Sequence, residues 1–206
     1  MRRLLLKNSF VEAIGPELNS ILIATIRIYS VLSMKTVNVV ESFERKISTP
    51  DFVNLYCDLF ATFHEGSKKY FQKYIAEISG LKKKPLDIYE NRMIEIYRKG
   101  NEDNNSTYKA LYHIRNSFSF HFSPTGNPPG LAEYIGYVDE SGKVTFVSSI
   151  PALFKCVETV LGKKMGQKEI QTFFRETLHE EVRPFIEYLQ ATIHQIVDPN
   201  SELEAE

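Results

Sequence analysis

The sequence predicts an all-α protein, a helical bundle of four long helices plus short helices, with a small inserted β-hairpin. In four long stretches apolar residues recur at spacings of three, four and seven, the period of an amphipathic helix. Clusters of glycine, proline and small polar residues separate these stretches, and a single short segment alternates apolar and polar residues as a strand does. We expect a single domain over residues 1–197 and an acidic, frayed tail over residues 198–206.

The first two long helices are expected in the N-terminal third of the chain. One begins at Pro16, which suits the first turn of a helix, and runs to about Ile47. The next begins at Thr49, a residue that can cap a helix N-terminus, and runs to Ile78 with a bend at Gly66.

The third long helix carries the residues of greatest chemical interest. A shorter amphipathic helix over residues 86–99 and a polar loop over residues 101–107 lead into a helix expected from about residue 106 to residue 122. Three prolines within residues 123–130 end this helix, because proline lacks a backbone N–H and has a fixed φ. His121 is therefore expected in the last helical turn, where the helix dipole favours a protonated imidazole.

The C-terminal part is predicted to contain the hairpin and two further helices. Residues 134–147 alternate in hydrophobicity around a four-residue turn and predict a short β-hairpin inserted into the helical domain. Residues 151–161 predict a short helix, and residues 167–197 predict a long one that Pro184 is expected to kink.

Composition and charge narrow the class of protein. The 206 residues are 43% hydrophobic and 25% charged, as in ordinary globular proteins. A formal net charge of −1 provides no overall field that attracts nucleic acid or anionic lipid, so any phosphate site must be local. Cys57 and Cys156 lie far apart without a Cys-x-x-Cys spacing and are interpreted as core thiols.

The N-terminal sequence predicts neither secretion nor a membrane anchor. The apolar run after Met1 stops at Lys7, too early for a signal peptide. The most apolar stretch, residues 18–40, is interrupted by Arg27 and Lys35 and is interpreted as falling short of a membrane span. We therefore expect a soluble, cytoplasmic protein without a membrane partner.

Arg115 and His121 are the leading candidates for a functional site. Each lies three positions from Phe118, so both fall roughly 60° to either side of that residue on the apolar side of one helix. RNA carries its own nucleophile, the 2′-hydroxyl, and its cleavage needs a proton-transfer group that works near neutral pH and a cation that holds the phosphate. His121 can supply the first and Arg115 the second, while Asn116 can orient His121 or donate to the phosphate.

The run Arg115-Asn116, four further residues and His121 resembles the signature of the HEPN superfamily of helical ribonucleases and RNA-processing toxins. This resemblance implies a metal-independent endoribonuclease that needs no cofactor and no metal, with Arg115, Asn116 and His121 as its catalytic residues. It further implies a homodimer in which the motifs of two subunits face one cleft, with RNA as substrate. Such an enzyme would act as a toxin or defence factor, and a toxin would also have an antitoxin protein as partner.

A non-catalytic HEPN-like module for dimerisation or binding is the alternative. In that case Arg115 pairs with a carboxylate of a neighbouring helix, for example Glu41 or Asp58, and His121 only interacts with the helix dipole. The neutral net charge and the single short motif favour this alternative.

Several further features remain open at the level of sequence. The aromatic residues Phe118, Phe120 and Phe122 suit either a core or a platform on which bases stack. The run of lysines at 82–84 suits either a solvated turn or a contact with an RNA backbone.

Metal chemistry is the weakest alternative. Glu176 and His179 form a Glu-x-x-His element of the kind found in di-iron bundles, but such sites need a second copy, which the sequence lacks. Arg183 stands where the helix of a zinc protease needs its second histidine. His64 and Glu65 are interpreted as a surface pair or a satisfied core pair.

Overall fold

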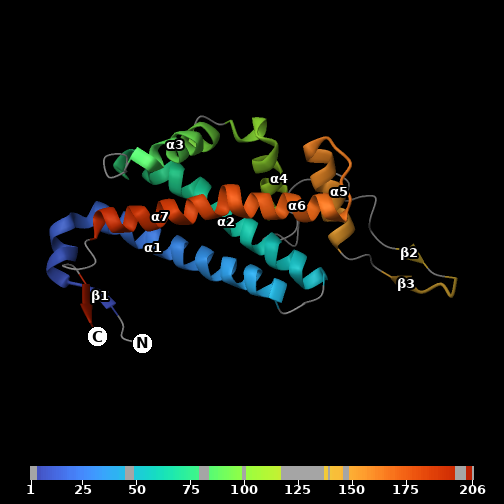
Figure 1. Ribbon diagram of the computed structural model, residues 1–206, viewed down its shortest axis with the longest axis horizontal. Helices are drawn as coiled ribbons and strands as arrows, with labels where there is room; N and C mark the ends of the chain where they lie inside the picture. Colours follow the sequence, from blue (N-terminus) through green and yellow to red (C-terminus); the bar gives the residue numbers. More distant parts are fainter. Residues whose placement is uncertain are drawn as a thin grey trace.

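In a computed structural model the chain is predominantly helical, which confirms the all-α prediction (Figure 1). The structure describes residues 4–44, 49–78, 84–98, 101–116, 137–138, 140–145, 149–197 and 203–205. The α-helices are α1 (Asn8–Glu44), α2 (Thr49–Ile78), α3 (Lys84–Met93), α4 (Ser106–Ile114), α5 (Ser149–Leu161), α6 (Gln167–Thr177) and α7 (Arg183–Ile196). Two π-helical segments, η1 (Ile94–Arg98) and η5 (Leu178–Val182), and a 3-10 turn, η2 (Glu102–Asn104), join some of them.

The arrangement of four long helices stays a prediction. Helices α1 and α2 are long, and α6, η5 and α7 follow one another without a break. The helix expected over residues 106–122 is described as far as Asn116, and its remainder lies outside the described residues.

α1 is a pair of helical segments joined at a glycine. Gly15 has φ 75° and ψ 168°, a backbone conformation that a residue with a Cβ rarely adopts. Pro16 follows and occupies the first turn of the longer segment, as the sequence predicted. The helical turn at residues 8–14 was not expected from the sequence.

Gly66 brings α1 and α2 close together and does not interrupt α2. A Cβ placed on Gly66 would lie 3.3 Å from Cγ2 of Ile28, on α1. The missing side chain therefore lets the two helices approach, and α2 continues through Gly66 as one helix; the bend expected there stays a prediction.

A π-helical segment, η5, lies just before Pro184, where the sequence predicted a kink. Proline cannot donate a hydrogen bond, and its ring crowds the carbonyl four residues earlier. The backbone N–H of Arg183 bonds to the carbonyl of Leu178, five residues before it, so the chain has one extra residue in this turn. The long C-terminal helix is thereby divided into α6 and α7.

Short strands lie beside the helical body. β2 (Tyr137–Val138) and β3 (Val144–Thr145) pair antiparallel inside the segment for which a hairpin was predicted, and the rest of that segment lies outside the described residues. β4 (Leu203–Ala205) pairs antiparallel with β1 (Leu4–Leu6), which places this part of the acidic tail beside the N-terminus in place of the fraying that the sequence suggested (Figure 1).

The core is built around the aromatic stripe of α2. Its aromatic side chains are fully buried and form edge-on and tilted contacts with aromatic residues of α6 and α7, with ring centroids 5.0 to 6.4 Å apart. The α2 members are Tyr56, Phe60, Phe63, Tyr70 and Phe71, and their partners are Phe174, Phe185 and Tyr188. α1 packs on α2 and α7, whereas α4 packs on α2 and α5 (Figure 1).

A buried carboxylate joins η5 to α3 and α4. Glu181 accepts two hydrogen bonds of 2.9 Å from the guanidinium of Arg92 and one of 2.7 Å from the hydroxyl of Tyr108. Because Arg92 of α3 and Tyr108 of α4 both donate to the carboxylate of Glu181 in η5, this interaction specifies how the three segments pack.

α1 also has the length and composition of a membrane-crossing helix. Within Asn8–Ser42 an 18-residue window has a mean hydropathy of 1.3, and 22% of that window is buried. A long helix of a soluble protein can have the same composition, and the cytoplasmic location stays a prediction.

Replacement of Glu181 by alanine is expected to destabilise the fold by about 2 kcal/mol, because Arg92 and Tyr108 lose their shared acceptor. Urea denaturation at pH 7 measures the change. Glu180→Ala is the matched control, since Glu180 is exposed and only its backbone carbonyl contacts Arg92. Equal stability of the two variants would show that the buried carboxylate does not stabilise the fold.

Candidate functional site

Arg115 and Asn116 lie at the C-terminal end of α4. Asn105 caps the start of this helix by accepting a 3.1 Å hydrogen bond from the backbone N–H of Tyr108. At Arg115 and Asn116 the backbone becomes π-helical, a local widening that is frequent at functional sites. Asn116 is buried, while the Arg115 side chain keeps 23% of its surface exposed.

The guanidinium of Arg115 is oriented by two acceptors. Nη1 donates a 2.6 Å hydrogen bond to Oδ1 of Asn116, and Nη2 lies 2.7 Å from Oε2 of Glu65 on α2. Nε is buried and has no hydrogen-bond partner among the described residues. Since a guanidinium has five N–H groups and these two contacts use only two of them, donors remain for an anion.

Glu65 carries a negative charge at the centre of this group. It pairs with Arg115 and also with Lys69, one turn further along α2. Burial by itself raises the pKa of the Glu65 carboxyl, but the hydrogen bond from Lys69 and the charge of Arg115 outweigh burial and hold the pKa below its ordinary value. The carboxylate is therefore ionised at neutral pH.

His64, the residue before Glu65, belongs to a second polar cluster. Its Nε2 lies 2.6 Å from Oε1 of Glu102, and the other oxygen of Glu102 accepts a 2.7 Å hydrogen bond from Lys68. The ring is almost fully buried between the edges of Tyr97 and Tyr112. His64 is therefore buried, but its partner is Glu102 and not Glu65, and its Nδ1 has no partner among the described residues.

Glu102 ties η2 to α2 through these contacts. Burial raises the pKa of its carboxyl, but the hydrogen bonds from His64 and Lys68 lower it more, so the pKa lies below the ordinary value. The loop that precedes α4 is thereby held by charge-assisted hydrogen bonds.

The structure brings two of the three predicted site residues together. Arg115 and Asn116 are hydrogen-bonded to each other, whereas His121 lies outside the described residues, as do Phe118 and Phe120. Phe122 and the lysines at 82 and 83 also lie outside them.

The carboxylate partner of Arg115 differs from those suggested by the sequence. Glu65 takes this place, while Asp58 binds Lys35 of α1 at 2.5 Å. The sequence carried one signal for Glu65, its spacing of four from Lys69 on a helix. Nothing in that spacing indicates that this face of α2 meets the end of α4.

The other sequence candidates have ordinary surroundings. Both cysteines are buried, which confirms them as core thiols, and burial raises the pKa of Cys57 to about 12 and that of Cys156 to about 11. Glu176 and His179 are exposed. Among the described residues no group of three or more His, Cys, Asp or Glu side chains could hold a metal ion.

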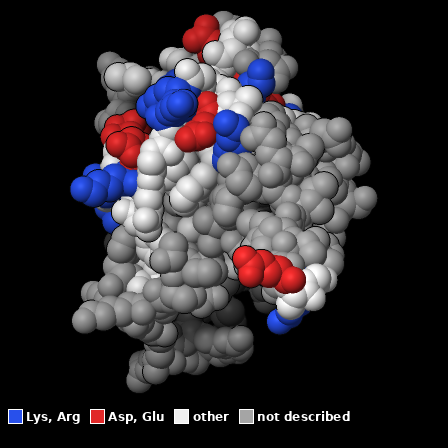
Figure 2. Space-filling model, turned by 90° about the vertical axis from the view of Figure 1, so that its right-hand side faces the viewer, with Lys and Arg blue, Asp and Glu red and all other residues white. Residues whose placement is uncertain are grey.

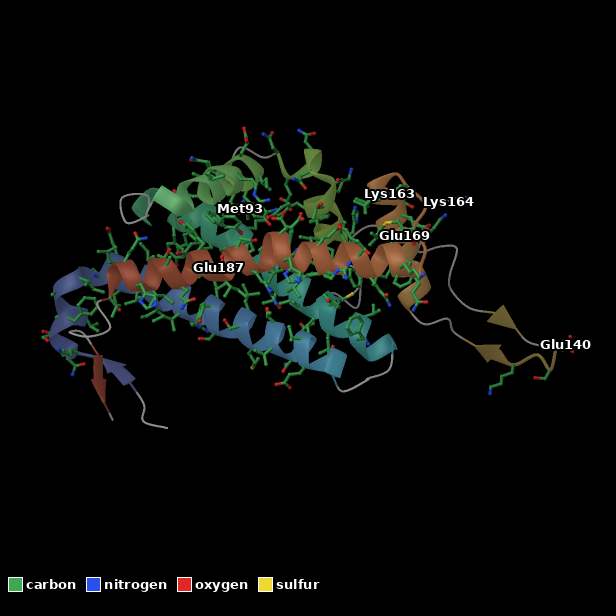
Figure 3. The ribbon with its side chains drawn as sticks, in the orientation of Figure 1. Met93, Glu140, Lys163, Lys164, Glu169 and Glu187 are labelled. Atoms are coloured by element: carbon green, nitrogen blue, oxygen red, sulfur yellow. The ribbon has the colours of Figure 1, made fainter. Side chains whose placement is uncertain are left out.

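A shallow hollow of about 260 Å³ lies at the turn between α5 and α6. Lys155, Lys163 and Lys164 line it together with Glu158, and Lys163 and Lys164 lie at the outer edge of the turn (Figure 3). Basic and acidic side chains are interspersed on this end of the molecule (Figure 2), so the described surface here has no field of one sign.

No protein-family model matches the chain, and comparisons with known proteins and with solved structures found no similar one. The likeness to the HEPN superfamily therefore depends on the motif at Arg115, Asn116 and His121 alone.

Replacement of Glu102 by glutamine is expected to change the pH dependence of stability. A carboxyl whose pKa is lower in the folded than in the unfolded state stabilises the fold fully above the unfolded value, near 4.3, and loses this effect as pH falls through the folded value. At pH 7 the variant should be less stable than the wild type by about 1 kcal/mol, because neutral hydrogen bonds replace charge-assisted ones.

The difference between the two proteins should shrink below about pH 4, as Glu102 becomes protonated in the wild type. Urea denaturation from pH 3 to pH 7 measures it. Glu187→Gln is the control, since Glu187 is an exposed residue of α7 (Figure 3). A difference that stays constant with pH would mean that the Glu102 charge does not stabilise the fold.

Proposed function

We propose that the chain is a metal-independent endoribonuclease in which Arg115 holds the scissile phosphate, Asn116 supports Arg115, and His121 transfers a proton. The observation that carries this proposal is the pre-oriented guanidinium of Arg115, fixed by Glu65 and Asn116 on a side chain that keeps 23% of its surface exposed. A planar cation that is held before the substrate arrives loses little entropy on binding phosphate.

The proposed reaction uses the nucleophile that RNA itself provides. The 2′-oxygen forms a bond to phosphorus, the bond from phosphorus to the 5′-oxygen breaks, and the products are a 2′,3′-cyclic phosphate and a 5′-hydroxyl. His121 either accepts the proton of the 2′-hydroxyl, while water protonates the departing 5′-oxygen, or donates a proton to the 5′-oxygen, while water takes the proton of the 2′-hydroxyl. Arg115 neutralises the charge that develops on the phosphate oxygens.

Glu65 has a positioning role in this proposal. Its carboxylate holds Nη2 of Arg115 and so fixes the plane of the guanidinium. The same carboxylate also forms an ion pair with Lys69. The same carboxylate lies close to the position of the phosphate and repels it. Glu65 therefore favours the correct orientation of Arg115 at some cost in affinity for RNA.

A non-catalytic binding module is the second candidate. It is favoured by the fact that both terminal nitrogens of Arg115 already have partners within the protein, as in a structural ion pair. A role as toxin or defence factor, an antitoxin partner and a cytoplasmic location are further proposals that depend on the ribonuclease activity.

Purified protein is expected to cleave RNA in the presence of EDTA. Arg115→Ala should lower kcat/KM by about 100-fold or more, since it removes the phosphate clamp, and His121→Ala by a similar factor, since it removes proton transfer. Gel analysis of labelled RNA measures the rates, and the cyclic phosphate end identifies the chemistry.

Matched controls separate catalysis from stability and from contaminating nucleases. Arg175→Ala and His194→Ala replace exposed residues of the same types on α6 and α7 and should leave the rate unchanged. Cleavage that persists in both site variants would exclude the ribonuclease proposal. Absence of cleavage in folded wild type would favour the binding module.

Replacement of Glu65 by glutamine tests the positioning role separately. Glutamine keeps an acceptor for Arg115 but removes the charge, so kcat should fall about tenfold while KM for RNA also falls by about threefold. Steady-state kinetics on a short oligonucleotide measure both constants. With Glu180→Gln as an exposed control, unchanged kcat in Glu65→Gln would contradict the role assigned to the carboxylate.

A further inference from the structure

α1 presents an apolar stripe to solvent on the side that faces away from the core. Met34 is 57% exposed, Val37 51% and Ile23 50%, and Val31 lies in the same stripe, with Ile26 and Val40 at its edges. Exposed apolar side chains that gather on one face of a helix indicate an interaction surface. We refer to these six residues as the outer stripe of α1.

The opposite face of α1 is buried in the core of the protein. Leu32 and Val39 are completely buried in the hydrophobic core, Leu22 is also completely buried, and Thr25 is buried in a 3.0 Å hydrogen bond with Tyr70 of α2. The outer stripe is therefore a second apolar face, left over after the chain has packed its own core.

The outer stripe has the pattern of a surface that fits its own copy. At about 100° per residue, Arg27 and Glu41 both lie within roughly 20° of the Met34 direction, seven residues before it and seven after it. If two α1 helices pair antiparallel about Met34, Val31 of each lies opposite Val37 of the other. The same pairing places Ser30 opposite Asn38 and Arg27 opposite Glu41, which has the opposite charge.

This match favours a second copy over lipid. The polar residues Arg27, Ser30 and Asn38 are exposed within the stripe, and a hydrocarbon environment would leave them without partners. An antiparallel copy supplies a partner for each. Arg27 and Glu41 match in the sense that opposite charges stand at facing positions of the two helices. Glu41 also has an interaction within its own chain.

We propose that the outer stripe of α1 is a homodimer interface in which the two α1 helices pack antiparallel with Met34 on the two-fold axis. α4, which carries Arg115, packs on the other side of α2 from α1 (Figure 1). This dimer therefore keeps the two Arg115 sites apart, in contrast to the shared cleft implied by the family resemblance. The interface does not depend on the proposed ribonuclease activity.

Disulfide formation at single introduced cysteines tests the geometry. Two facing helices 8–10 Å apart, with Cα atoms about 2.3 Å from each axis, bring the two Met34 Cα atoms to about 4–5 Å, within disulfide range. Met34→Cys should therefore form a covalent dimer on mild oxidation of the full chain. Ile23→Cys should not, because each Ile23 lies eleven residues, about 16.5 Å, from the two-fold axis, so that about 33 Å separates the two copies.

The two variants are well matched, since both positions are about half exposed and apolar. The native Cys57 and Cys156 are buried and should not compete for oxidation. Equal cross-linking of both variants, or none at Met34→Cys, would overturn the proposed pairing.

Sedimentation equilibrium provides a second test. Met34→Lys should weaken dimerisation by about 100-fold because it places a charge on each side of the axis, while Ile88→Lys on α3, at a position that is 82% exposed, should not. Circular dichroism checks that both variants stay helical. A wild type that is monomeric at all concentrations would overturn the proposal. Flotation of such a monomer with phosphatidylglycerol vesicles would assign the stripe to a membrane surface instead.

Discussion

The packing of α2 on several sides is the constraint on which the rest of the structure depends. Its aromatic stripe is buried against α6 and α7, while α1 and α4 contact it from other directions. Burial of so much aromatic surface is strongly favourable, but it makes a polar group of α2 that is buried without a partner costly. Ser67 bonds to Tyr97, Tyr70 to Thr25 and His64 to Glu102, so the hydrophobic and polar contacts of α2 specify the same arrangement.

The candidate site is a consequence of this packing. Glu65 and Lys68 lie on a helix whose position is already fixed; Lys68 meets Glu102 in the loop before α4, and Glu65 meets Arg115 at the end of α4. A charged group that is held on a rigid helix needs little reorganisation when a ligand binds. The opposite side of the molecule is different in character, because there α1 leaves an apolar stripe uncovered.

Much of the fold could be predicted from local sequence signals. Pro16 marks the first turn of the long segment of α1, and Pro184 marks a change in helical geometry. Contacts between helices gave no such signal. Gly66 was interpreted only as a possible bend of α2; the structure shows that it lies where Ile28 of α1 approaches, and no local pattern reports such a contact.

The sequence by itself determined that the chain is helical and that Arg115 and Asn116 follow one another in the helical segment that begins near residue 106, because helical period and spacing are local properties. Only the tertiary structure decided that Glu65 is the partner of Arg115 and that His64 is buried with Glu102. It also decided which face of α1 is covered, since both faces are rich in apolar residues. The physical reason is the same in each case: which groups lose contact with water depends on which helices meet, and residues distant in the sequence decide that together.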